Sequence, residues 1–456
     1  MQLRLTAAVL AMAASGPVLA QEAGIALVDD AESILPRRQQ AILMNALLEE
    51  KQRTILPQVM RENSIDMWIV SEGDGPLYVS LLESEADGAV LETPPHLVFF
   101  DRGEGADIER LMAESDDLAE IVRTRSPDRI AIGGGRSRRS RRAVAESERA
   151  EVAQRLGDDL ASRVVPAATL ANHWLGTRTS REQSVFRHVL RLAHEIIAEA
   201  FSNRVIIPDV TTTDDVNWWI RQRYADLGLG TVDHPTITVQ RSKAERAKYA
   251  DDDEYFRVFD ERFVDDPSPR VGLNVVIRRG DLIFCDTGIM YLGLYTDTQQ
   301  SGYVLRDGED EPPEGIQEAM RHVLRFQDLI GEEMRLGRGG NEIGIAAVER
   351  AREEGIQGNL YAHSLAYYFM RYGILGRFFS DEVHSGGSGL SSGRGRGDGG
   401  RPLRHNTLFA LELDIQYELP EWDGQRIVVF SETGMTFTPD GMVFPGGRET
   451  EWLVIR

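Results

Sequence analysis

The stretch Leu282–Thr298 (LIFCDTGIMYLGLYTDT) constrains the fold more than any other part of the chain. Two apolar runs end in Asp286 and Asp297 and are separated by Gly288 and Gly293, a pattern that predicts a β-hairpin. Each carboxylate stands where a core side chain is expected, and two buried acids repel each other unless a cation neutralises them. The hairpin alone leaves two interpretations open: a metal site, or one aspartate capping a turn and the other on a solvated edge.

Two further strand-like segments each carry one acid at an inward position. Thr407–Ile415 (TLFALELDI) contains Glu412, and Ile427–Thr433 (IVVFSET) contains Glu432. With the two aspartates of the hairpin, they make four carboxylates embedded in apolar strands. Such an oxygen-rich set is what a pair of divalent ions requires, so the four acids together favour the metal site.

The same residues resemble the pita-bread metallopeptidases, which include methionine aminopeptidase, aminopeptidase P, prolidase and the related creatinase. The resemblance lies in D-T-G, in T-D-T with its aspartate eleven positions after the first, and in the two later glutamates. In that family two Asp, one His and two Glu hold two metal ions. The resemblance therefore implies metal ligands at Asp286, Asp297, Glu412 and Glu432, and an α+β fold with a smaller N-terminal α/β domain.

The fifth family ligand, a histidine, is displaced in this chain. In the segment Tyr361–Gly373 (YAHSLAYYFMRYG) the ligand position falls on Met370 and a preceding histidine position on Tyr368. Neither a thioether nor a phenol replaces imidazole well on a hard divalent ion. Two alternatives follow: His363, seven residues before Met370, has been recruited as the ligand, or one metal ion is weakened or absent.

Two more histidines are candidates by the same resemblance. His384 (in FFSDEVH) matches a second family histidine that binds substrate near the metals, and we assign it a catalytic role beside Glu412 as acid/base. His234 (in DHPTITVQ) lies nearest to the place where a further catalytic histidine would precede Asp286. For these residues, as for His363, an ordinary core or surface histidine is the alternative.

The resemblance implies two domains, and hydrophobic periodicity indicates the helices and strands within them. Residues 35–177 are predicted to form the N-terminal α/β domain, with a helix over Leu35–Arg61 and another around Ile108–Ala113. Residues 178–456 are predicted to form the pita-bread domain. In the resembled fold, the sheet of this domain is covered by helices, here predicted over Arg178–Arg204, Pro313–Glu333 and Asn341–Glu354. The strands predicted for the first domain are Ile65–Val70, His96–Phe100 and Arg129–Ile132.

Residues 1–20 have the pattern of a secretory signal peptide: Arg4 near the start, an apolar segment, Gly16-Pro17 and a small-residue end. We expect export to a bacterial periplasm and a mature chain that begins near Gln21. No other run is long enough to cross a bilayer. An internal disulfide is excluded because Cys285 is the one cysteine, and we expect it to be a core residue rather than a nucleophile.

The net charge of −22 and the pI of about 4.9 argue against general binding to nucleic acids or anionic membranes. The basic run Gly133–Arg142 is expected to be a solvated loop, with an anionic partner as the alternative. The glycine-rich Ser385–Gly400 is expected to be a disordered insertion, and a flap over the site is the alternative.

These observations predict an exported, metal-dependent hydrolase of peptide-like amide bonds. By the resemblance, two divalent ions (Mn, Co or Zn) are bridged by Asp297 and Glu432, and Asp286, Glu412 and His363 complete the ligand set. A metal-activated water, assisted by Glu412, would attack the carbonyl of a short peptide or other small amide, with proline after the scissile bond as one substrate choice. A homodimer is expected by analogy. The alternative is a degenerate, inactive family member that acts as a binding or scaffold protein.

Overall fold

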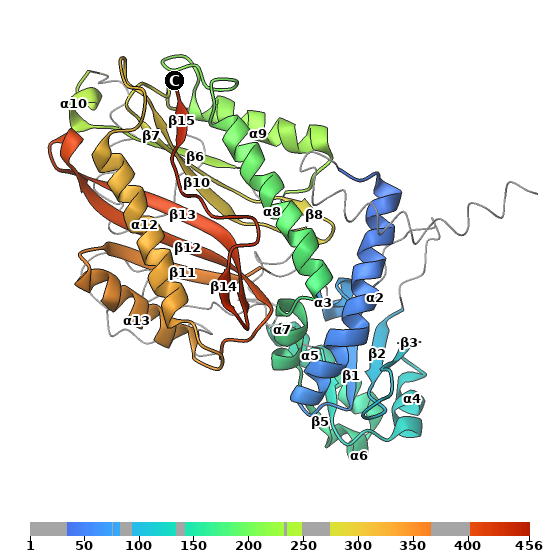
Figure 1. Ribbon diagram of the computed structural model, residues 1–456. Coiled ribbons are helices and arrows are strands. Elements are labelled where there is room, and N and C mark those ends of the chain that lie inside the picture. Colours follow the sequence, from blue (N-terminus) through green and yellow to red (C-terminus); the bar gives the residue numbers. More distant parts are fainter. Residues whose placement is uncertain are drawn as a thin grey trace, which may run out of the picture. The chain divides into compact units, whose positions relative to one another are not determined.

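The computed structural model describes residues 34–74, 76–82, 94–133, 142–231, 235–248, 274–365 and 402–456 (Figure 1). The predicted signal peptide (residues 1–20), His234, Tyr368, Met370 and His384 lie outside the described residues, as do most of the basic run and the whole of the glycine-rich segment. The chain divides into two compact units within helix α8 (Ser180–Ala200), between His188 and Val189, and Leu292–Leu294 group with the first unit. The predicted domain boundary at Thr177 stays a prediction.

The first unit is built on a five-stranded mixed sheet, as predicted for this part of the chain. Its strand order is β3-β2-β1-β4-β5, in which β2 is antiparallel to both neighbours and β1, β4 and β5 are parallel. The strands are β1 (Met67–Ser71), β2 (His96–Phe100), β3 (Glu109–Ala113), β4 (Ile130–Ile132) and β5 (Val164–Pro166). The helices are α2 (Arg37–Glu62), α3 (Pro76–Val79), α4 (Leu118–Arg125), α5 (Arg142–Leu156), α6 (Asp158–Ala161) and α7 (Ala168–Gly176).

The helix predicted around Ile108–Ala113 is wrong, because Glu109–Ala113 forms the edge strand β3. Its residues pair with β2 in an antiparallel register that sets Leu111 opposite Val98. A segment of about five residues is too short to repay helix nucleation, whereas an existing sheet edge supplies its hydrogen bonds at once. Tertiary pairing therefore decides the conformation of this segment.

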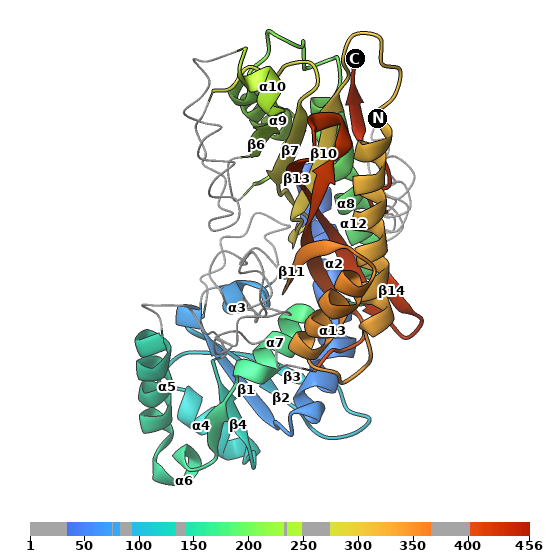
Figure 2. The same ribbon diagram turned by 90° about the vertical axis from the view of Figure 1, so that its left-hand side faces the viewer.

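The second unit contains an eight-stranded sheet, which confirms the predicted α+β class (Figures 1 and 2). The order is β11-β12-β13-β10-β7-β6, with β14 paired to β13 and β15 paired to β10. All of these pairings are antiparallel except that of β15 with β10. The strands are β6 (Thr236–Gln240), β7 (Leu282–Thr287), β10 (Thr298–Val304), β11 (Gln357–Ser364), β12 (Thr407–Leu419), β13 (Gln425–Thr438), β14 (Gly441–Val443) and β15 (Leu453–Ile455).

Helices α12 (Glu314–Glu333) and α13 (Gly340–Glu353) pack on one face of this sheet, α12 against β12 and β13 and α13 against β11 (Figures 1 and 2). Leu411, Leu413 and Ile415 of β12 join Phe326 of α12 in one buried cluster. Since side chains alternate along a strand, Glu412 must point to the opposite face. Packing of the helices thus assigns the acids to the other side of the sheet.

Helix positions in the second unit agree with the sequence within a few residues. The two predicted helices that follow the hairpin correspond to α12 and α13, although α13 begins at Gly340, one residue before the predicted start. Helix α9 (Thr213–Leu227) starts with a capping box in which Thr212 and Asp215 satisfy each other's backbone N–H groups. Within the residues that the structure describes, no helix is long and apolar enough to span a lipid bilayer.

The hairpin predicted over Leu282–Thr298 is present, but its second strand starts later than predicted. Strands β7 and β10 pair antiparallel, so that Thr287 stands opposite Thr298. The run before Asp297 instead forms a small separate hairpin of β8 (Met290–Tyr291) and β9 (Leu294–Tyr295). Its two turn residues, Leu292 and Gly293, both have positive φ, which suits a tight hairpin turn. Asp297 consequently lies directly before β10.

A buried ion pair fixes the β6 end of the sheet and gives a stability prediction. Arg241 donates two hydrogen bonds of 2.7 Å to the carboxylate of Asp281, and the two side chains are 1% and 0% exposed. Arg241→Ala leaves the buried Asp281 carboxylate uncompensated, so we expect the free energy of unfolding to fall by about 3–5 kcal/mol in urea denaturation. Arg426→Ala, which removes a half-exposed partner 3.9 Å from Glu418, should change it by less than about 1 kcal/mol. Equal losses in both variants would contradict the prediction.

Candidate metal centre

The five residues predicted as metal ligands come from four strands and one connection of the second unit. Asp286 lies in β7, His363 in β11, Glu412 in β12 and Glu432 in β13, while Asp297 directly precedes β10. Glu412 and Glu432 stand directly opposite each other in the pairing of β12 with β13. Neighbouring side chains at such a pair share one face of the sheet, here the face opposite to α12.

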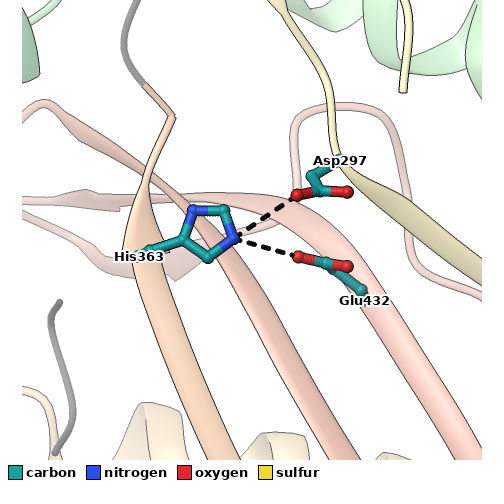
Figure 3. Close-up of side chains that lie close together, drawn as sticks. All are labelled: Asp297, His363 and Glu432. Carbon is teal, nitrogen blue, oxygen red and sulfur yellow. Dashed lines mark ion pairs between the residues drawn. The ribbon is translucent and has the colours of Figure 1, made fainter. Parts of the chain in front are cut away.

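Three of the five residues converge in space. The imidazole Nε2 of His363 lies 3.5 Å from Oδ2 of Asp297 and 3.3 Å from Oε1 of Glu432 (Figure 3). One ligand atom from each residue lies within 4.8 Å of the others. An imidazole nitrogen with two carboxylate oxygens is a donor set that suits Mn²⁺, Co²⁺ or Zn²⁺. The residues present therefore fit one divalent ion.

Burial makes the negative charges of this cluster unfavourable. The side chain of Glu432 is 2% exposed, against 12% for His363 and 20% for Asp297. Burial raises the pKa of Glu432 well above its ordinary value, and the charges of Asp297, Glu412 and Asp286 raise it further. A cation at this position would supply the charge that these carboxylates lack.

Asp286 and Glu412 are connected by a residue that the sequence analysis missed. The side-chain Nε2 of Gln299 lies 3.0 Å from Oε1 of Glu412 and 3.4 Å from Oδ2 of Asp286. Gln299 is the second residue of β10, where it stands opposite Asp286 on one side and Glu432 on the other. The signal was present in the sequence, because a polar residue two positions after Asp297 shares the face of the acids in an extended strand.

A further buried acid lies beside the cluster. Asp414 is two residues after Glu412 in β12, and its carboxylate accepts hydrogen bonds of 3.0 and 3.3 Å from Nδ2 of Asn359. Burial raises the pKa of Asp414 to about 7, opposed by the Asn359 hydrogen bond and reinforced by the Glu412 charge. Asp414 thus adds a further titratable group to the face that carries Glu412.

The structure places His363 beside Asp297 and Glu432, on the face of the sheet that carries the acids. Strand β11 pairs with β12 so that His363 stands opposite Ala410, two residues from Glu412 on the same face. This geometry favours recruitment of His363 over loss of the histidine function. The assignment of His363 as a ligand, like that of the four carboxylates, stays a prediction.

Cys285 faces away from this site. It is fully buried and stands opposite Gln300, on the other face of the sheet from Asp286. Burial, and to a smaller extent the charge of Asp286, raises the pKa of the Cys285 thiol well above its ordinary value. A protonated, inaccessible thiol is a poor nucleophile, which agrees with the expected core role.

The profile of Metallopeptidase family M24 matches residues 185–438 of the sequence. Among solved structures, the chain is similar to the X-Pro aminopeptidase from Thermotoga maritima (TM-score 0.54, 13% identity, covering 87% of this chain and 99% of the other). It is also similar to a dipeptidase from Pyrococcus horikoshii (TM-score 0.51, 15% identity, 90% and 99% covered) and to the Xaa-Pro dipeptidase from Bacillus anthracis (TM-score 0.50, 15% identity, 89% and 99% covered). These similarities show a shared fold. A search of curated protein sequences finds no match.

Replacement of Glu432 should have opposite effects on the stability of the metal-free and the metal-loaded protein. The raised pKa means that the metal-free fold loses stability as the pH rises above the ordinary value of 4.5, because ionisation of Glu432 is easier in the unfolded chain. At pH 8, Glu432→Gln should therefore raise the melting temperature of the EDTA-treated protein. Mn²⁺ at about 100 times its Kd should stabilise the parent by about 2.7 kcal/mol and the variant much less.

The matched control for this experiment is Glu418→Gln, in which the replaced side chain of β12 is 73% exposed. It should leave both the melting temperature and the response to Mn²⁺ unchanged, as calorimetry would show. A lower melting temperature of metal-free Glu432→Gln would contradict the electrostatic account of the site.

Proposed function

The chain belongs to metallopeptidase family M24, and on this premise we propose that it is a metal-dependent hydrolase of peptide-like amide bonds. The observation that carries the proposal is the cluster of Asp297, His363 and Glu432, which brings an imidazole and two carboxylates together on one sheet face. The α+β architecture, with the pita-bread fold of the family, supplies the strands that hold these residues. Fold alone does not establish an activity, so the proposal rests on the site.

The three residues of the cluster would hold a divalent ion, with Mn, Co and Zn as candidates. When bound, such an ion polarises a carbonyl group and lowers the pKa of a water molecule. Glu412 stands opposite Glu432 and is proposed as the acid/base: its carboxylate would take a proton from the attacking water and return it to the leaving amine. His384 lies outside the described residues, and its role in substrate binding stays a prediction.

The substrate class is proposed from the similar structures. They are described as an X-Pro aminopeptidase and an Xaa-Pro dipeptidase, so short peptides with proline after the scissile bond are the first substrates to test. If two ions bind, as the sequence predicts, Asp286 and Glu412 would hold them together with Asp297, His363 and Glu432. A homodimer stays a prediction by analogy.

The competing function is that of an inactive family member that binds peptides or scaffolds a partner. It is motivated by the sequence, in which Tyr368 and Met370 occupy the positions of family histidines. Retention of Asp286, Asp297, Glu412 and Glu432 favours the hydrolase.

Removal of a cluster residue should abolish most of the activity. We expect His363→Ala and Asp297→Ala to lower kcat/KM for an Xaa-Pro dipeptide in Mn²⁺ buffer by about 10²–10³-fold, since several kcal/mol of transition-state stabilisation depend on the ion. His322→Ala, a change on α12 at a 26% exposed side chain, should leave it unchanged. A parent protein that binds Mn²⁺ without cleaving Xaa-Pro or other dipeptides would favour the inactive alternative.

Export is a separate proposal, supported by the leader pattern of residues 1–20. When the full chain is expressed in a Gram-negative host, we expect the periplasmic fraction to contain a protein whose N-terminus lies near Gln21. Intact mass spectrometry measures this directly. A cytoplasmic product that retains residues 1–20 would refute export without affecting the proposed hydrolysis.

A further inference from the structure

Gln299 occupies the centre of the acidic residues of the site. Its strand, β10, lies between β7 and β13, so that its backbone neighbours are Asp286 and Glu432. The side chain is buried, with 4% of the residue exposed. A neutral amide thus stands at the position where four carboxylates require a positive partner.

The orientation of the amide follows from its neighbours. Nε2 lies within 3.4 Å of both Oδ2 of Asp286 and Oε1 of Glu412. The amide oxygen Oε1 is buried and makes no hydrogen bond within the described part of the chain. Turning the amide over would set this oxygen against two carboxylate oxygens, which repel it. The NH₂ group therefore faces the acids.

An NH₂ group in this orientation is incompatible with an ion at the same place. The amide nitrogen offers two N–H protons and no lone pair to a metal ion. An ion held by Asp286 and Glu412 would have to lie where these protons point. The amide nitrogen instead hydrogen-bonds Asp286 and Glu412, whereas His363 meets Asp297 and Glu432, so an ion at that second set of residues meets no such conflict.

We propose that Gln299 takes the place of the second ion, so that the site holds one divalent ion, at Asp297, His363 and Glu432. The inference rests on the proposed function, since it presupposes a metal at that cluster. Hydrogen bonds from an uncharged donor to carboxylates supply part of the stabilisation that a cation would otherwise give. Gln299 is then a positioning residue that fixes Glu412, the proposed acid/base, through a 3.0 Å hydrogen bond.

The test is the number of ions bound per chain. Isothermal titration of the EDTA-treated protein with Mn²⁺, together with elemental analysis, should give one ion for the parent and two for Gln299→Ser, in which the amide no longer blocks the second position. The spectrum of Mn²⁺ in electron paramagnetic resonance should change from that of an isolated ion to that of a coupled pair. Neither readout depends on turnover.

The chain supplies a matched control in the next residue. Gln300 is also buried, with 7% exposed, but it pairs with Cys285 and points to the opposite face of the sheet. Gln300→Ser should keep one ion. If Gln299→Ser folds poorly, Gln299→Glu provides a nearly isosteric variant that turns the donor into an acceptor and should also bind two ions.

Each other outcome is decisive. Two ions in the parent, or one ion in both Gln299 variants, would overturn the inference and leave the proposed function intact. Loss of the ion in Gln299→Ser would show that Gln299 is a ligand through Oε1, which also overturns it. A parent that binds no Mn²⁺ would refute the metal-dependent function itself.

Discussion

Repulsion among buried carboxylates is the constraint on which the rest of the site depends. Asp286, Asp297, Glu412 and Glu432 are brought to one sheet face, and the pKa of Glu432 is raised by burial and by the other three. Such a cluster costs stability unless positive charge or hydrogen-bond donors offset it. The imidazole of His363, the amide of Gln299 and a bound cation can each offset part of this repulsion.

The sheet can hold this cluster because its other face supplies stability. Leu411, Leu413 and Ile415 pack with α12 in a continuous apolar cluster, and strict alternation then directs Glu412 away from that core. The antiparallel register of β12 with β13 sets Glu412 directly opposite Glu432. The hydrophobic face thus determines on which side of the sheet the acids lie.

The family and the site contribute different parts of the argument for a function. Membership of metallopeptidase family M24 gives the architecture, and the cluster around His363 gives a reason to expect metal chemistry. Solved structures at 13–15% identity share the fold with this chain, so specificity has to be argued from its own side chains. Among these side chains, Gln299 affects the proposed chemistry most directly, because its amide approaches both Asp286 and the proposed acid/base Glu412.

The sequence by itself determined the local features: acids inside apolar strands, the helices that became α12 and α13, and a family resemblance that the M24 match confirms. Only the tertiary structure decided which residues meet. Periodicity assigns a residue to a face, but the register across strands comes from long-range pairing. The local pattern therefore could not predict the approach of His363 to Glu432 or the position of Gln299 between Asp286 and Glu432. The same reason made Glu109–Ala113 an edge strand instead of the predicted helix, since a short segment takes the conformation that its neighbours complete.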